Sequence, residues 1–304
     1  MSTPANLELR NFKWSDLDAF HRLLNAIGRH GHRDWPSEPG ELRATLEFLR
    51  VQPENNIAFA VDGGELVGYA IIEPEANIGR SVIGVGASTP GMAIRNDLIG
   101  WATDCAARVA PIAHLSTRDN ETEFEKLVEQ LSWSKVRTYL KLISPGDQTR
   151  ELVVPSGFSV RTMLGLDEVP ELTEIQNAAF AEHFGYSPNT EEEIKAQLLA
   201  TDTGLDNVVL VHDSDNRLVA YCWTQINLRD GRKVGRIVMT GVHPSSRGQG
   251  LGRTIAEAGY RHLVDLGVHS MELDVDSMNT AALRVYEFLG FAKSSQVSWW
   301  EREL

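Results

Sequence analysis

Residues 236–253 read RIVMTGVHPSSRGQGLGR, and this stretch decides the fold that the sequence predicts. Its apolar first part ends at His243 and Pro244, as strands often do, and an amphipathic helix is expected from Arg253 to Leu266. Between them, glycines let backbone N–H groups turn toward one point, and the helix start adds unpaired donors and partial positive charge. The stretch therefore predicts a strand, a loop and a helix that can hold a diphosphate.

A turn that only joins a strand to a helix would also be rich in glycine, and it is the simplest alternative to a phosphate cradle. Two other phosphate motifs do not fit. The loop does not end in the Gly-Lys-Ser/Thr of NTP-binding loops, and Gly248, Gly250 and Gly252 lack the spacing of a dinucleotide fingerprint. What remains is Arg247-x-x-Gly250-x-Gly252 after a strand.

A second motif, NTAALRVYEFLGF, occupies residues 279–291. Ala282, Val285 and Leu289 recur at helical spacing, and Gly290 suits the end of a helix. Tyr286 would lie on this short helix. In an arbitrary helix such a tyrosine would most often only bury its ring in the core.

The two motifs, in this order and spacing, resemble the GNAT superfamily of acyl-CoA-dependent N-acyltransferases, whose central motif is Gln/Arg-x-x-Gly-x-Gly/Ala after a strand. The resemblance implies that acetyl-CoA is the co-substrate and that no metal takes part. It also implies that coenzyme A is bound by Thr240, Gly241, Val242, Arg247, Gly248, Gln249, Gly250, Leu251, Gly252, Arg253 and Asn279.

The resemblance further implies a direct transfer, in which a neutral amine attacks the thioester and no acyl-enzyme forms. A main-chain N–H between Thr240 and Val242 would stabilise the developing negative charge. In GNAT enzymes the tyrosine that matches Tyr286 commonly serves as general acid toward the departing thiolate. Neither cysteine is required by this scheme.

An incoming ammonium must lose a proton, so a general base is expected. In residues 271–276, MELDVD, apolar side chains share one face of the expected strand and acids the other. Asp274 matches the carboxylate that ribosomal-protein N-terminal acetyltransferases of the superfamily use as base, although a solvated acidic face is an equal alternative. His243, Glu182 and His183 are weaker candidates.

The chain repeats one order of elements twice. A strand and a helix are expected at 7–10 and 16–27 and again at 158–161 and 169–180, and each half continues with a hairpin, a third strand, a helix and a strand. Pro145, Gly146, Pro155 and Gly157 indicate a connection between the halves. We therefore expect an α/β (mixed α+β) fold of two tandem GNAT-like domains, 1–145 and 156–304, each with a largely antiparallel sheet flanked by helices.

The first half has lost the residues that would hold the cofactor. An ungapped alignment of residues 85–95 with 242–252 matches Arg247 with Pro90, Gly250 with Ala93 and Gly252 with Arg95. A similar alignment matches Tyr286 with Val128. Side chains would then stand where a phosphate should approach bare backbone. We expect a degenerate first domain and a catalytic second domain.

Composition excludes several classes of partner. The 29 basic and 42 acidic residues give a net charge of −13, which disfavours nucleic acid and anionic membrane. The two cysteines, Cys105 and Cys222, cannot build a disulfide framework, and the first 24 residues lack the apolar run of a signal peptide. A cytoplasmic protein without a membrane or metal partner is expected.

The function that follows is acetyl-CoA-dependent N-acetylation of a primary amine on a small molecule or peptide, by a monomer or homodimer. The tandem arrangement also looks like that of the mycothiol synthases, which act on a cysteinyl aminosugar. Those enzymes have an acidic residue where this chain has Arg236. A non-catalytic acyl-CoA sensor or interaction module is the alternative from a different class.

Overall fold

The computed structural model describes residues 7–28, 35–36, 38–48, 52–88, 91–146, 151–199, 204–229 and 231–304. The chain forms two compact units. The first unit contains Met1–Thr138 together with Gln296–Leu304, and the second contains Tyr139–Ser295. Pro90, which the first-half comparison places on Arg247, lies outside the described residues.

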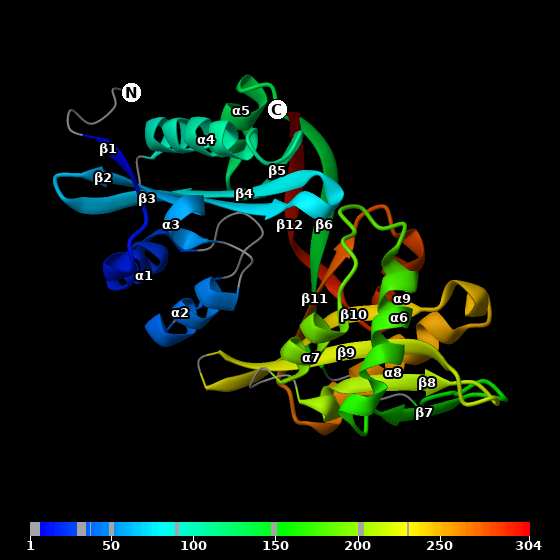
Figure 1. The fold of residues 1–304 in the computed structure, drawn as a ribbon. Coiled ribbons are helices and arrows are strands. Elements are labelled where there is room, and N and C mark those ends of the chain that lie inside the picture. Colours follow the sequence, from blue (N-terminus) through cyan, green and yellow to red (C-terminus); the bar gives the residue numbers. More distant parts are fainter. Residues whose placement is uncertain are drawn as a thin grey trace. The chain divides into compact units, whose positions relative to one another are not determined.

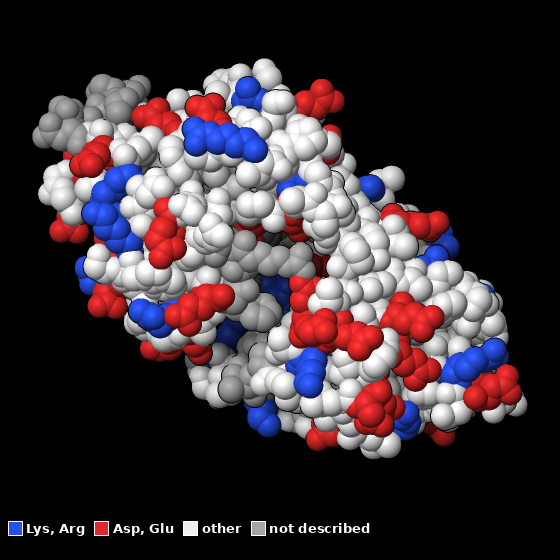
Figure 2. All heavy atoms as spheres, in the orientation of Figure 1, with Lys and Arg blue, Asp and Glu red and all other residues white. Residues whose placement is uncertain are grey.

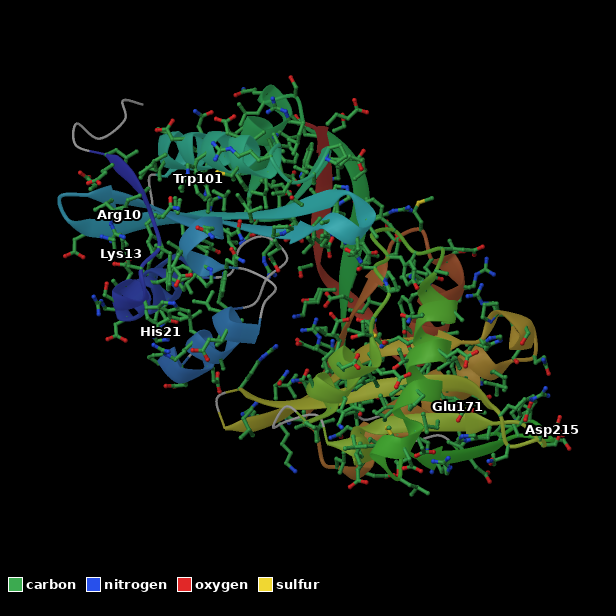
Figure 3. All side chains as sticks on the ribbon, in the orientation of Figure 1. Arg10, Lys13, His21, Trp101, Glu171 and Asp215 are labelled. Atoms are coloured by element: carbon green, nitrogen blue, oxygen red, sulfur yellow. The ribbon has the colours of Figure 1, made fainter. Side chains whose placement is uncertain are left out.

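The first unit is built on a sheet whose strands follow the order β1-β2-β3-β4-β5-β12. Their bounds are β1 Glu8–Asn11, β2 Ile57–Asp62, β3 Glu65–Glu75, β4 Arg80–Ala87, β5 Ile112–Arg118 and β12 Ala292–Glu303. Only β4 and β5 pair in parallel among the pairs described for this unit. Arg10 of β1, labelled in Figure 3, binds the Asp16 carboxylate through both terminal nitrogens at 2.7 and 2.9 Å.

Helices cover both faces of this first sheet (Figure 1). They are α1 Leu17–Ile27, α2 Pro39–Phe48, α3 Pro53–Asn56, α4 Met92–Ala106 and α5 Thr122–Gln130. Alternation along β2 sends Ile57, Phe59 and Val61 into the core under α1 and α2, and Ala60 into the core under α4 and α5.

The second unit repeats the plan with strand order β6-β11-β10-β9-β8-β7. The strands are β6 Ser134–Ser144, β7 Ser159–Thr162, β8 Val208–His212, β9 Leu218–Arg229, β10 Arg232–Val242 and β11 Ser270–Asp276. The helices are α6 Val169–Phe180 and α7 Glu191–Leu199, which cover one face, and α8 Leu251–Asp265 and α9 Thr280–Phe288, which cover the other. The prediction of mixed, largely antiparallel sheets flanked by helices is confirmed, whereas α2 and α7 were not predicted.

The strands that close the two halves are exchanged. Residues 297–303 of β12 pair with β5 in the first unit, and Trp300 is buried in that unit's core. Residues 139–144 of β6 pair with β11 in the second unit, where Leu142 joins the core. Each sheet is thus completed by a strand from the other half of the sequence. The ranges 1–145 and 156–304 stay a prediction for separate domains.

The last helix is equivalent in the two halves. Val128 lies six residues beyond the first residue of α5, as Tyr286 lies six beyond the first residue of α9. Both helices are followed by a left-handed residue, Ser132 with φ 64° and Gly290 with φ 81°. The apolar Val128 therefore occupies the place of the second half's tyrosine hydroxyl.

Charged side chains of both signs are interspersed on the face shown in Figure 2. Among the described residues, no helix combines the length and the apolar character needed to cross a membrane.

Candidate active site

The sheet of the second unit opens between two of its strands. β10 and β11 run parallel and pair from Val234 with Ser270 to Ile237 with Leu273. Both strands continue beyond this point, to Val242 and Asp276, without pairing with each other. Main-chain groups of β10 are therefore turned toward a gap between strands, and we call this opening the splay.

A β-bulge lies at the start of the splay. The register between β10 and β9 shifts between Ile237 and Met239, so that Val238 is the extra residue. The bulge resets the alternation, and Thr240 comes to the face that carries α8 and α9 while Met239 faces α6. Without it, Thr240 would point away from Tyr286.

Backbone amides cluster where the loop enters α8. Gly248 and Gly250 are left-handed, with φ 81° and 82°, and Gly250 is the N-cap of α8. In the part of the chain that the structure describes, the N–H groups of Gly248, Gln249, Gly250, Leu251 and Gly252 donate to no protein acceptor. A Cβ on Gly248 or Gly250 would meet nothing within 4 Å. Open donors at a helix start fit a diphosphate.

Two arginines flank these amides. Arg247 donates to the carbonyl of Ala179 at 3.0 Å, which ties the loop to the end of α6. The guanidinium of Arg253 stacks on the Phe288 ring at 3.7 Å, and both side chains remain about half exposed. Two partly exposed positive charges therefore lie on either side of the loop in the sequence.

Strand β10 presents bare backbone next to this loop. A Cβ at Gly241 would lie 2.5 Å from Cε1 of Tyr221 and 2.9 Å from Cβ of Ala179, so no side chain fits there. Thr240 Oγ1 contacts the Cys222 sulfur at 3.5 Å, and Val242 packs against the core under α8. The structure therefore places Thr240, Gly241 and Val242 next to the amide loop, and their role in binding coenzyme A stays a prediction.

Tyr286 is buried on α9 against Phe291, with ring centroids 5.8 Å apart. Burial raises the pKa of its hydroxyl to about 12, although the interaction with Thr240 lowers the pKa and the nearby Cys222 raises it. At neutral pH the hydroxyl therefore keeps its proton. This protonated hydroxyl interacts with Thr240 of β10, in the part of the strand that borders the splay.

Asp274 lies on the opposite face of the sheet from Tyr286. Met271, Leu273 and Val275 pack into the core with Tyr286, so Glu272 and Asp274 point the other way. Arg236 Nη2 donates to Asp274 Oδ2 at 2.8 Å. Because pairing ends at Leu273, Asp274 is the first residue of β11 beside the splay.

Glu272 forms a closed ion-pair network on the same face. It accepts from both terminal nitrogens of Arg229, at 2.7 and 2.6 Å, and contacts Lys141 Nζ at 3.0 Å. Burial opposes ionisation, but the Arg229 hydrogen bonds and the Lys141 charge outweigh it and lower the pKa of Glu272 to about 2. The network holds β9, β11 and β6 together at the closed end of the splay.

The remaining candidates have local structural tasks. Asn279 is the N-cap of α9, with its oxygen 3.1 Å from the Ala282 nitrogen, and His243 caps the turn at Ser245. Glu182 is exposed and lies 4.0 Å from Arg247. His183 is half-buried; burial lowers its pKa, Arg247 lowers it further, and Asp276 and Glu182 oppose this.

The start of α4 in the first unit differs from the start of α8. Helix α4 begins at Met92 with Gly91 as its N-cap, so Gly91 is the residue that corresponds to Gly250. The sequence alignment that matched Ala93 with Gly250 is therefore wrong by two residues. Gly91 has φ −104°, and a Cβ there would collide with the Ser88 carbonyl. Arg95 is bound to Glu121 at 2.9 Å. The described residues at the start of α4 therefore lack the two left-handed glycines of the α8 loop, and Arg95 is held by an acid.

A cavity of about 680 Å³ lies beside the loop, on the side of the β8–β9 turn. Its lining includes His243 and Gln249 and three acidic residues, Glu171, Glu174 and Asp213. Figure 3 labels Glu171. The lining holds these three carboxylates and one arginine, Arg217, which is paired with Asp213, so the excess of negative charge disfavours phosphates. Within the described residues, no group of three His, Cys, Asp or Glu side chains is arranged to hold a metal.

Sequence reasoning did not find the bulge at Val238 or the partners of the acids on β11. The alternation of acids in residues 271–276 signals a polar face. It does not reveal that Arg236 pairs with Asp274, or that Arg229 and Lys141 enclose Glu272, because those contacts come from three other strands.

Comparison with known proteins agrees with this geometry. Residues 169–291 match the acetyltransferase (GNAT) family. The mycothiol acetyltransferase of Propionibacterium freudenreichii subsp. shermanii is 28% identical over 235 residues, 77% of this chain and 73% of that protein. That of Rhodococcus erythropolis is 34% identical over 180 residues, 57% and 59% of the two chains.

Solved structures share the fold over nearly the whole chain. A GCN5-related N-acetyltransferase from Sphaerobacter thermophilus superposes with a TM-score of 0.79 at 20% identity, covering 99% of this chain and 97% of that one. A tandem GNAT protein from the clavulanic acid biosynthesis pathway gives 0.74 at 14% identity, covering 98% of each chain. The resemblance drawn from residues 236–291 is confirmed: the chain carries a GNAT acetyltransferase domain at residues 169–291, and the protein is an acyltransferase.

Proposed function

We propose that the protein is an acetyl-CoA-dependent N-acetyltransferase that acetylates a primary amine of a small molecule or peptide by direct attack. The observation that carries the proposal is the group of five backbone N–H donors around Gly250 that, among the described residues, have no protein acceptor and are flanked by Arg247 and Arg253. Bound there, acetyl-CoA would supply the activated acetyl thioester. The amides and arginines would hold its diphosphate, and β10 would align its arm along the splay.

The residues on the two faces of the splay divide the proton transfers. As the amine nitrogen bonds to the acetyl carbon and the carbon–sulfur bond breaks, Tyr286 would give its proton to the sulfur. The proton lost by the ammonium would pass to Asp274 or to water. Cys222 is fully buried and burial raises the pKa of its thiol to about 12, which supports attack without a cysteine acyl-enzyme.

The mycothiol acetyltransferase relatives favour a second candidate, acetylation of a cysteinyl aminosugar. Arg236 argues against it, because a positive charge stands where the amine cation would approach. The remaining alternative, a non-catalytic acyl-CoA sensor, would use the same amide loop but would not need a protonated Tyr286 at the splay.

A pair of glycine variants tests the cofactor site. Gly250 and Gly267 lie just outside opposite ends of α8, both have positive φ, and a Cβ on either meets nothing within 4 Å. Gly250→Val and Gly267→Val therefore impose similar backbone strain. Calorimetry should show that Gly250→Val weakens acetyl-CoA binding at least about tenfold, whereas Gly267→Val binds like the parent.

Turnover is checked by thiol release. Free CoA should appear from acetyl-CoA with at least one member of a broad amine panel that includes the cysteinyl aminosugar. Binding without release from any amine would favour the sensor, and no binding of any CoA species would remove the proposed function.

A further inference from the structure

Two charged side chains that are partly exposed lie at the start of the splay. α8 and α9, with Tyr286, cover one face of the sheet, and α6 and α7 pack on the other face. The side chains of β10 and β11 at the start of the splay on this second face are Arg236 and Asp274, which are 31% and 40% exposed. An amine that approaches the splay from this face meets these two charges.

The Arg236–Asp274 pair differs from the neighbouring pair around Glu272. The Glu272 side chain is only 5% exposed, and its carboxylate oxygens already contact Arg229 and Lys141, so it cannot readily bind a ligand as well. Arg236 and Asp274 are 31% and 40% exposed and share one hydrogen bond. Within the described residues neither makes another hydrogen bond or ion pair, which leaves most of the guanidinium donors and Asp274 Oδ1 open.

Two opposite charges side by side select the kind of ligand. A simple ammonium would be attracted by Asp274 and repelled by Arg236, so the pair offers it little. A molecule with an anionic and a cationic group on one carbon gains from both charges, because each group meets its opposite. An Arg fork also matches the planar shape of a carboxylate, which it binds through two parallel hydrogen bonds.

Building on the proposed function, we propose that Arg236 and Asp274 together bind the acceptor, and that this acceptor is an α-amino acid with a free carboxylate. The carboxylate binds Arg236 and the ammonium binds Asp274, which is thereby separated from its arginine partner. The amine then lies beside the splay, next to the carboxylate that can take its proton. Amines without a neighbouring carboxylate, including peptide N-termini and the cysteinyl aminosugar, leave Arg236 without a partner other than Asp274.

The test compares each amino acid with its own carboxamide, which keeps the amine and removes the negative charge. Binding to the full-length protein in the presence of CoA is measured by calorimetry, and CoA release is measured with acetyl-CoA. For at least one L-α-amino acid of the panel, the binding affinity and the kcat/KM should each be at least about tenfold higher than for its amide.

Variants separate recognition from sheet stability. Arg236→Gln should abolish the preference for the amino acid over its amide, because it weakens the amino acid and, by removing a charge that repels the ammonium, does not weaken the amide. Arg236→Lys should keep part of the preference. Arg232→Gln removes the same charge from the same strand without touching Asp274, so it should keep the preference. Asp274→Asn should weaken both ligands, because both carry the ammonium.

Equal use of acid and amide by the parent, an equal loss of both in Arg236→Gln, or no binding of any amino acid would overturn the assignment. If amides react as well as acids, the transferase function stands and this acceptor assignment falls. If amino acids bind through Arg236 but no amine releases CoA, the acceptor site stands and the transferase function falls.

Discussion

Replacing Glu272 with Gln should destabilise the second unit by an amount that depends on pH. The fold lowers the pKa of Glu272 from 4.5 to about 2, and at about 1.4 kcal/mol per pH unit this corresponds to about 3 kcal/mol in favour of the ionised carboxylate. A depressed pKa contributes stability that is fully present above 4.5 and is lost as the pH falls through 2. Glu272→Gln should therefore lower the free energy of unfolding by about 3 kcal/mol at pH 7 and by progressively less below pH 4.5.

Trp223 is the only tryptophan between residues 139 and 295, so it can report on the second unit alone. The protein would be labelled with 5-fluorotryptophan and unfolded in urea at pH 7, 5 and 3, with Trp223 followed by fluorine NMR. Asp274→Asn is the control, because its exposed ion pair should contribute about 1 kcal/mol or less. A Glu272→Gln loss that is as small as the control, or equal at pH 7 and pH 3, would refute the reasoning.

Two further predictions concern the acid and the exchanged strands. Tyr286→Phe should lower kcat by about 10- to 1000-fold with little change in acetyl-CoA affinity. Because the pKa of Tyr286 is about 12, the rate of the parent enzyme should not decline through tyrosine ionisation below about pH 10. An unchanged kcat in the variant would exclude the acid role. Fragments 1–145 and 156–304 should each be insoluble or unfolded when produced alone, because the first lacks Trp300 and the second lacks Leu142. The two fragments should copurify when they are produced together. If circular dichroism and gel filtration show a folded, monomeric fragment 156–304, this prediction is contradicted.

Local signals in the sequence predicted much of the second unit. Some patterns depend only on one loop or one helix, so they can be recognised before the fold is known. These are the glycines at 248, 250 and 252 and the helical spacing of Ala282, Val285 and Leu289. The hairpins around residues 63 and 215 are equally local. Helices α2 and α7 were missed because their apolar stripes are short, with only two buried residues each among the described side chains: Leu42 and Leu46 in α2, and Ile194 and Leu198 in α7.

Contacts between distant strands could not be predicted. Nothing in the residues around Trp300 or Leu142 specifies which sheet each strand joins, because both candidate sheets offer an apolar face and an open edge. The register of the first-half loop failed for a related reason. An ungapped slide counts residues, whereas the start of α4 is set by the turn at Gly91.

The pairing of β5 with β12 has a consequence for how the protein is made. Trp300 Nε1 donates to Thr117 Oγ1 at 3.0 Å across 183 residues of sequence. The half of the gene translated first therefore yields a nascent chain whose strand β5 stays uncovered until residues 297–303 have left the ribosome. We expect the uncovered edge of β5 to favour aggregation during that interval, and we expect a frameshift near the 3′ end of the gene to destabilise the half encoded at its 5′ end.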